Sequence, residues 1–191
     1  ELHRRASAWY EAQNMLDDAL EHAVAAGDSA RTAHIVETHG RSLLFRGELP
    51  TLLRWIAALP EDTIQANERI STAHAWALLL TGQSELVGPR LRAVEHVAPP
   101  DSPLLGDVAA IRAYMAAQEG DVPRTIELSE RALEALPPAK LGERAVVYFV
   151  LGGARLLDGD FSAAADTFGR AASIGQRSGN LHLALPALNA A

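Results

Sequence analysis

Five turn signals recur along the chain at nearly regular intervals, and each lies between two stretches with helical patterning. They are Gln13-Asn14, Gly47-Glu48, Gly82-Gln83, Gly120-Asp121 and Gly159-Asp160. Taking Asn14 and the four glycines as equivalent positions, the intervals between them are 33, 35, 38 and 39 residues. Asparagine and glycine adopt the left-handed conformation that ends many helices. Internal periodicity on this scale predicts a stack of helix–turn–helix repeats.

The residues around the turns support this register. Seven positions before each turn the residue is always small: Ser7, Gly40, Ala75, Ala113 and Gly152. Five positions after the turn the residues are small to medium, namely Ala19, Leu52, Val87, Thr125 and Ala164. Twelve positions after it they are Ala26, Leu59, Val94, Ala132 and Ala171. Because interiors are close-packed, two helices approach closely only where side chains are small. These columns therefore predict the contacts between paired helices.

The last unit resembles the tetratricopeptide pattern most closely, with Leu151-Gly152, a glycine turn, Ala164 and Phe168 in the expected places, although Arg155 replaces the usual tyrosine. We predict an all-α fold, a TPR-like α-α superhelix forming a single domain, a right-handed solenoid of about five helix-turn-helix repeats. The predicted repeats are 1–28, 29–60, 61–100, 101–138 and 139–178, with a partial sixth over 179–191. The predicted helices are 2–12, 15–27, 30–46, 49–59, 64–81, 84–97, 104–119, 122–136, 141–158 and 161–178.

Composition excludes several classes of function. Net charge is −7, and the single lysine, Lys140, leaves no basic cluster that would neutralise the phosphates of a nucleic acid. Cysteine is absent, so disulfides and thiol chemistry are excluded. No apolar run reaches the roughly 18 residues of a membrane helix, and the start does not resemble a signal peptide. We expect a cytoplasmic protein without membrane contact, and a fragment of a longer protein because both ends lie within helical patterning.

The chain contains none of the sequence motifs that carry catalysis, such as a phosphate-binding loop, a nucleophile elbow or His-Glu-x-x-His. We therefore expect no enzyme activity and no cofactor in this fragment. The seven histidines include His34 and His39, whose spacing of five puts them on poorly matched faces of one helix. A metal site assembled across repeats stays open, but solvated or hydrogen-bonded histidines are the simpler interpretation, so no metal site is predicted.

The inner wall of the predicted solenoid offers a sharper hypothesis. The residue after each small contact position faces the concave surface, and there the chain places Trp76 and Tyr114. Aromatic side chains in a concavity suit ligand recognition, since they supply contact area at low entropic cost. The alternative is that both rings only fill gaps between repeats. The candidate ligand-binding residues, with their neighbours on the same faces, are Arg69, Thr72, Trp76, Asp107, Tyr114 and Gln118.

Several runs of the sequence also resemble a known protein family. The runs Leu2-His3-Arg4-Arg5-Ala6-Ser7-Ala8-Trp9-Tyr10 and Ala19-Leu20-Glu21-His22-Ala23 resemble large ATP-dependent transcriptional regulators, the MalT-like proteins of the LuxR group. So do Leu52-Leu53-Arg54-Trp55-Ile56-Ala57-Ala58-Leu59-Pro60 and Ala73-His74-Ala75-Trp76-Ala77-Leu78. The resemblance is strongest over residues 2–95. After about residue 100 the sequence resembles helical repeats in general and not this family in particular.

The resemblance implies a bacterial protein with an ATP-binding module, a helical-repeat sensor and a helix-turn-helix (HTH) domain. This chain would be the start of the sensor, with ATP and DNA bound by domains outside it. The implied partners are a small-molecule inducer or a regulatory protein, and a second copy of the regulator through self-association. The alternative is a general tetratricopeptide scaffold for protein–protein interaction. Scaffolds that bind a peptide usually hold its carboxylate with Lys, Arg and Asn on the inner helices. That version of the alternative is weak here, because the chain has only one lysine.

Overall fold

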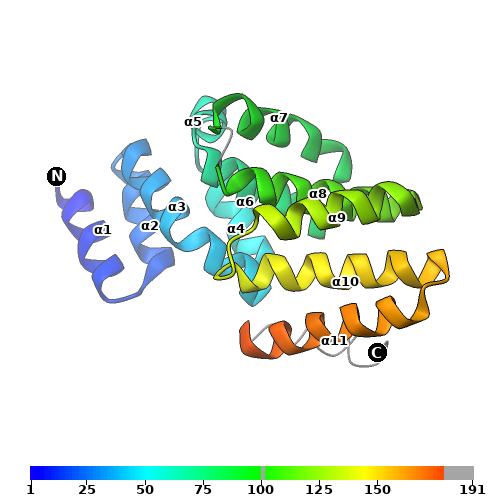
Figure 1. Ribbon diagram of the computed structural model, residues 1–191. Helices are drawn as coiled ribbons and strands as arrows, with labels where there is room; N and C mark the ends of the chain where they lie inside the picture. Colours follow the sequence, from blue (N-terminus) through cyan, green and yellow to red (C-terminus); the bar gives the residue numbers. More distant parts are fainter. Residues whose placement is uncertain (100–101, 179–191) are drawn as a thin grey trace. The chain divides into compact units, whose positions relative to one another are not determined.

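The computed structural model describes residues 1–99 and 102–178, and within them the chain is helical apart from its turns (Figure 1). Contacts divide the chain into two compact units, Glu1–Val97 and Ala98–Ala191. Unit 1 contains α1 Leu2–Ala12, α2 Leu16–Ala25, α3 Ser29–Arg46, α4 Leu49–Ala57, α5 Glu61–Ala66, α6 Glu68–Leu80, the short 3-10 helix η1 Ser84–Leu86 and α7 Val87–Val97. Unit 2 contains α8 Leu104–Glu119, α9 Val122–Ala135, α10 Leu141–Asp158 and α11 Phe161–Ser178. The all-α prediction is confirmed, and the predicted partial repeat 179–191 lies outside the described residues.

All five predicted turns have the left-handed backbone conformation. The φ angle is 59° at Asn14, 78° at Gly47, 79° at Gly82, 75° at Gly120 and 90° at Gly159. Residues with a Cβ rarely adopt positive φ, which is why glycine, or asparagine with its short polar side chain, occupies these positions. The turn register taken from the sequence is therefore confirmed.

The column of small residues also lies where two helices meet. Ser7, Ala75 and Ala113 are fully buried, and the glycines of the column are buried with them. A Cβ added at Gly40 would lie 3.1 Å from Cδ1 of Leu52 on the paired helix, and one added at Gly152 would lie 2.8 Å from the Phe168 ring. The predicted close approach of α3 to α4 and of α10 to α11 is confirmed.

One predicted helix, 64–81, is wrong as a single element because the chain breaks at Asn67. Asn67 has an extended backbone, with φ −108° and ψ 105°, and its side-chain oxygen accepts hydrogen bonds from the backbone N–H groups of Arg69 and Ile70. This is the N-cap geometry that starts a new helix, so α5 and α6 are separate. The Ser71 hydroxyl then donates to the Ile64 carbonyl at 2.7 Å and ties the two helices together.

The core of unit 1 combines aliphatic side chains with one anchored tryptophan. Ile35, Leu52, Trp55 and Ile56 are at most 1% exposed. The indole Nε1 of Trp55 on α4 donates a hydrogen bond to the Asp17 carboxylate on α2 at 2.7 Å. The N–H of a buried tryptophan usually has a hydrogen-bond partner, and this contact ties α4 to α2.

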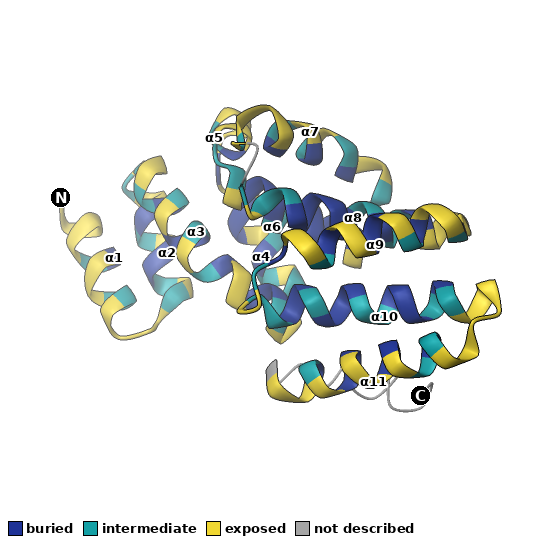
Figure 2. Cartoon of the chain, viewed as in Figure 1, coloured by how far each residue is buried: buried dark blue, intermediate teal, exposed yellow. Residues whose placement is uncertain are grey.

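Unit 2 is an ordered stack in which α10 packs against α8 and α9 on one side and against α11 on the other (Figure 1). Figure 2 shows the result, since α10 is buried or half-buried along most of its length while α9 and α11 each expose one face. A close backbone approach involves Gly106, where an added Cβ would lie 3.0 Å from the backbone nitrogen of Leu136. Only a residue without a Cβ allows α8 and the end of α9 to pack this tightly.

A half-buried histidine is expected to make unit 1 sensitive to acid. Burial lowers the pKa of His74 to about 4, helped by the nearby Arg90 guanidinium and opposed by Glu61. Nδ1 of the ring is buried and has no hydrogen-bond partner. Because the pKa of His74 in the folded protein lies below the usual value of 6.5, the unfolded chain binds the proton more readily. The contribution of neutral His74 to the free energy of unfolding is therefore fully present above pH 6.5 and is lost as the pH falls towards 4.

We therefore expect the free energy of unfolding of unit 1 to fall by about 1–2 kcal/mol across that window, less than full burial would give because the ring keeps some solvent contact. Urea unfolding at about pH 7.5 and about pH 5 measures it. The glutamine side chain of His74→Gln is uncharged at both pH values. Its free energy of unfolding should therefore fall less between the two pH values than that of the wild type, by about 1–2 kcal/mol. Equal losses in both proteins would contradict the assignment to His74.

Candidate functional site

A hollow of about 450 Å³ opens in unit 2 between the C-terminal halves of α8 and α10 and the start of α9. We call it the Tyr114 hollow. Its walls include Tyr114, Gln118, Val122, Phe149, Gly153 and Leu157. The volume falls within the range of about 300–1,000 Å³ that small-molecule sites span. The hollow is therefore large enough for a ligand.

The repeat register explains why the hollow forms there. Tyr114 on α8 and Gly153 on α10 each follow the small residue at which their helix contacts its partner. Successive first helices of two repeats thus present equivalent positions to the same space, one filled by a phenol ring and the other by a hydrogen atom. An added Cβ at Gly153 would meet no atom within 4 Å, so this glycine leaves part of the hollow empty.

Two of the predicted ligand residues, Tyr114 and Gln118, line this hollow together. They lie one turn apart on α8, a spacing that puts two side chains on one helix face. Tyr114 is half-buried and Gln118 is exposed. The structure thus brings these two residues to one surface, and their contact with a ligand stays a prediction.

Asp107, a third candidate, lies deeper on α8 and does not line the Tyr114 hollow. Its side chain is only 2% exposed and forms an ion pair with the Lys140 ammonium just before α10. A buried carboxylate needs such a partner because desolvation otherwise disfavours its charge. In this structure Asp107 holds α8 to the start of α10.

The remaining candidates, Arg69, Thr72 and Trp76, belong to α6 in unit 1. Arg69 is exposed and pairs with Glu37 at 3.0 Å, while the Thr72 hydroxyl donates to the Glu68 carbonyl at 2.7 Å. Trp76 is 3% exposed, and its indole Nε1 is buried without a hydrogen-bond partner. Since Trp76 and Tyr114 lie in different units, their predicted adjacency stays a prediction.

Comparison with known proteins assigns this architecture to a family. Residues 106–190 match the family model described as the MalT-like TPR region. Over 187 residues, 97% of the chain, the sequence is 30% identical to the HTH-type transcriptional regulator MalT of Cronobacter sakazakii. The chain is a MalT-like helical-repeat region. The predicted TPR-like fold class and the family resemblance are both confirmed, and the chain spans about a fifth (21%) of the length of that relative.

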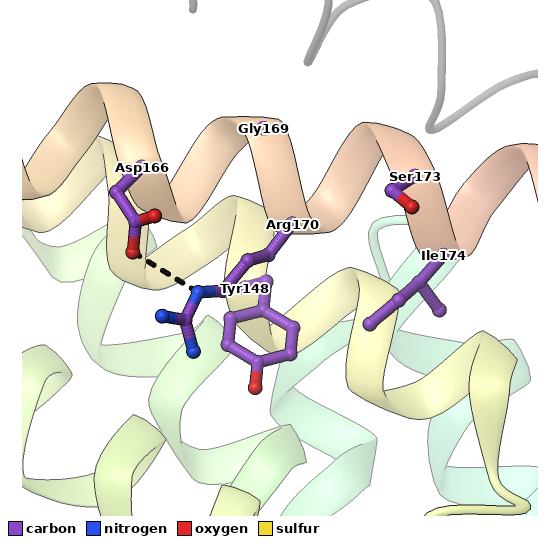
Figure 3. Close-up of a pocket in the computed structure, with 6 residues that line it drawn as sticks. All are labelled: Tyr148, Asp166, Gly169, Arg170, Ser173 and Ile174. Atoms are coloured by element: carbon purple, nitrogen blue, oxygen red, sulfur yellow. Dashed lines mark ion pairs between the residues drawn. The ribbon is translucent and has the colours of Figure 1, made fainter.

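The MalT-like region has a second, shallower hollow of about 330 Å³ between α10 and α11 (Figure 3). Tyr148 on α10 lies beneath the Arg170 side chain of α11, and Arg170 forms an ion pair with Asp166 at 3.0 Å. Hydrogen bonding to Tyr148 and the Asp166 charge raise the pKa of Arg170 above its usual value. Both members of the ion pair are largely exposed, and exposed pairs contribute little binding or stability.

Several residues of the Tyr114 hollow were absent from the sequence-based candidates. Phe149, Leu156 and Leu157 form its α10 wall. The signal in the sequence was the position of Leu156 and Leu157, which come just before the turn at Gly159. In the structure these two side chains are 44% and 75% exposed. Large apolar side chains at a helix end, beyond the core-facing positions, indicate a surface that contacts something else.

Two histidines of the MalT-like region meet at one carboxylate, and His39 is hydrogen-bonded to it, as the simpler interpretation of the histidines expects. His34 and His39 were assigned to poorly matched faces, yet the Nε2 atoms of both approach the Glu11 carboxylate, at 3.9 Å and 3.2 Å. Glu11 on α1 also accepts a hydrogen bond from Arg31. In the described part of the chain no group of three or more His, Cys, Asp or Glu side chains is placed to hold a metal ion. Across residues 1–99 and 102–178, no helix has the length and apolarity needed to span a membrane.

Proposed function

We propose that this chain is the start of the ligand-sensing and self-association region of a bacterial ATP-dependent transcriptional regulator of the LuxR group. The observation that carries the proposal is the similarity to an HTH-type transcriptional regulator over 97% of the chain, together with the MalT-like TPR match over residues 106–190. The ATP-binding and HTH domains then belong to other parts of the protein. DNA is bound only through the latter.

The geometry of unit 2 supports a sensing role over a purely structural one. A stack whose only task is to hold domains apart gains stability by filling its surface hollows. Here the small residues Gly153, Ala117 and Ala154 line about 450 Å³ of open space next to Tyr114. A ligand in that space contacts α8, α9 and α10 at once, so its binding favours one relative arrangement of three helices. Differential affinity of this kind is what shifts a conformational equilibrium.

The coding sequence around this chain provides the first test. We expect a phosphate-binding loop on its N-terminal side and a LuxR-type HTH on its C-terminal side. A gene that encodes neither overturns the proposal. In that case the general interaction scaffold becomes the better assignment, because it needs no nucleotide or DNA module.

A variant of the intact regulator lacking residues 1–191 provides the second test. We expect it to retain DNA binding in a gel-shift assay but to lose ATP-dependent self-association in sedimentation velocity. Transcription of the genes that change when the regulator's gene is deleted should not be restored by this variant. Full restoration would show that the region has no part in regulation.

A further inference from the structure

The Tyr114 hollow has an uncharged lining. Among the described residues that form its walls there is no Asp, Glu, Lys, Arg or His side chain, although charged residues are 21% of the chain. A charged ligand entering the hollow would lose hydration without meeting a counter-charge, which disfavours it strongly. Charge complementarity therefore selects an uncharged occupant.

The polar groups of the hollow are few. The Tyr114 hydroxyl and the Gln118 amide have no hydrogen-bond partner among the described residues, whereas the Thr125 hydroxyl already donates to the Asp121 carbonyl at 2.7 Å. A saccharide carries many hydroxyl groups, and most would be left unpaired against Val122, Phe149 and the leucines. Unpaired polar groups removed from water are costly, so an occupant with one or two polar groups fits better.

The mouth of the hollow is apolar and exposed to water. Leu157 is 75% exposed and Leu156 is 44% exposed, and both line the opening. An occupant that covers them removes apolar surface from water, which is the main driving force for binding an apolar molecule. The half-buried Phe149 and Tyr114 rings add flat surfaces of the kind that small-molecule sites use.

We infer that the Tyr114 hollow binds an uncharged, predominantly apolar small molecule, with Tyr114 and Gln118 hydrogen-bonding its one or two polar groups. The regulatory meaning of this site rests on the proposed function, but the binding itself does not. An apolar side chain of a partner protein is the competing occupant. The partial enclosure by three helices favours a small molecule, because a ligand can be surrounded on several sides there.

Binding is tested on the 191-residue chain with the neutral dye N-phenyl-1-naphthylamine, whose fluorescence increases in apolar surroundings. Gly153→Leu places a side chain into the empty space and should weaken dye binding at least about tenfold. Gly169→Leu is the matched control: it is also a helical glycine with no atom within 4 Å of an added Cβ, but it lines the other hollow. Its dye affinity should stay within about twofold of the wild type.

A second variant keeps the test decisive if Gly153→Leu disturbs folding. Leu157→Gln changes an exposed side chain at the mouth and should weaken dye binding about three- to tenfold with unchanged thermal unfolding. Dye affinity that is unchanged in both variants, or lost in Gly169→Leu instead, overturns the assignment to this hollow.

Displacement of the dye tests the ligand class. We expect neutral 1-naphthol to displace it, 1-naphthoate to require at least about tenfold higher concentration, and sucrose to leave it bound. Equal displacement by 1-naphthoate, or displacement by sucrose, overturns the proposed chemistry. Dye excluded only by a bound partner protein, with no displacement by 1-naphthol, supports the competing occupant and also overturns it. None of these results depends on transcription, so failure here is distinguishable from failure of the proposed function.

Discussion

Gly152→Ala is expected to lower the free energy of unfolding of unit 2 by about 1–3 kcal/mol, whereas Gly153→Ala should leave it unchanged or raise it by up to about 1 kcal/mol. The two glycines are adjacent in α10, so both gain the same helix propensity from alanine. They differ in what the new methyl group meets. At Gly152 it would lie 2.8 Å from two carbons of the Phe168 ring, and at Gly153 it meets nothing within 4 Å.

Urea unfolding followed by circular dichroism measures both variants, with the slope of the transition checked for each. The double variant Gly152→Ala/Phe168→Leu removes the ring that the methyl group strikes, so the two changes together should cost less than the sum of their separate effects. Equal stability of Gly152→Ala and Gly153→Ala would show that the α10–α11 contact relaxes freely. The packing reason for a small residue at this column would then be wrong.

The repeat register was predictable because it depends on local chemistry. Positive φ at Asn14 and at Gly47 follows from the short list of residues that tolerate that conformation, and the helices on either side follow from composition. The column containing Gly152 was predictable for a related reason. Identical helix hairpins meet at the same offset from each turn, so the constraint on size repeats and becomes visible along the chain.

The break at Asn67 shows where local information was insufficient. The pattern of apolar residues continues from Ile64 to Ile70 and resembles one helix. Asn67 ends it because its side chain both caps α6 and donates to Glu37 of α3 at 3.0 Å, a contact across 30 positions in the chain. A helix former would keep the two segments continuous. Long-range partners decide between these outcomes, and they cannot be read from a window of sequence.

The candidate site also has a part that local spacing predicts and a part that depends on contacts with other helices. Tyr114 and Gln118 were placed on one face by helical spacing, and the structure has them on one hollow. Asp107 satisfied the same spacing rule, yet it is buried and paired with a lysine 33 positions away. Spacing identifies which residues share a face but not how deep that face lies. Depth is set by the neighbouring helix, here by the approach of α9 at Gly106.

Lys140→Met is expected to lower the free energy of unfolding of unit 2 by about 2–4 kcal/mol, a large effect for a residue outside the helices. The Lys140 ammonium pairs with the Asp107 carboxylate, which is almost completely removed from water. Methionine keeps most of the aliphatic stem but removes the charge, so Asp107 loses an ion-pair partner in a buried setting. Because Asp107 keeps another interaction and Lys140 is 21% exposed, the effect stays below that of a fully isolated charge.

The double variant Asp107→Asn/Lys140→Met separates charge from packing. If the loss in Lys140→Met arises from the buried carboxylate, neutralising Asp107 in the same chain should recover at least half of it, measured as a double-mutant cycle. Arg170→Met is the control, since it removes a cation from the exposed pair with Asp166 and should give no measurable change. A loss in Lys140→Met as small as in the control would mean that the other interaction of Asp107, not the ion pair with Lys140, stabilises the buried carboxylate. The role of this ion pair in holding α8 to the start of α10 would then be wrong.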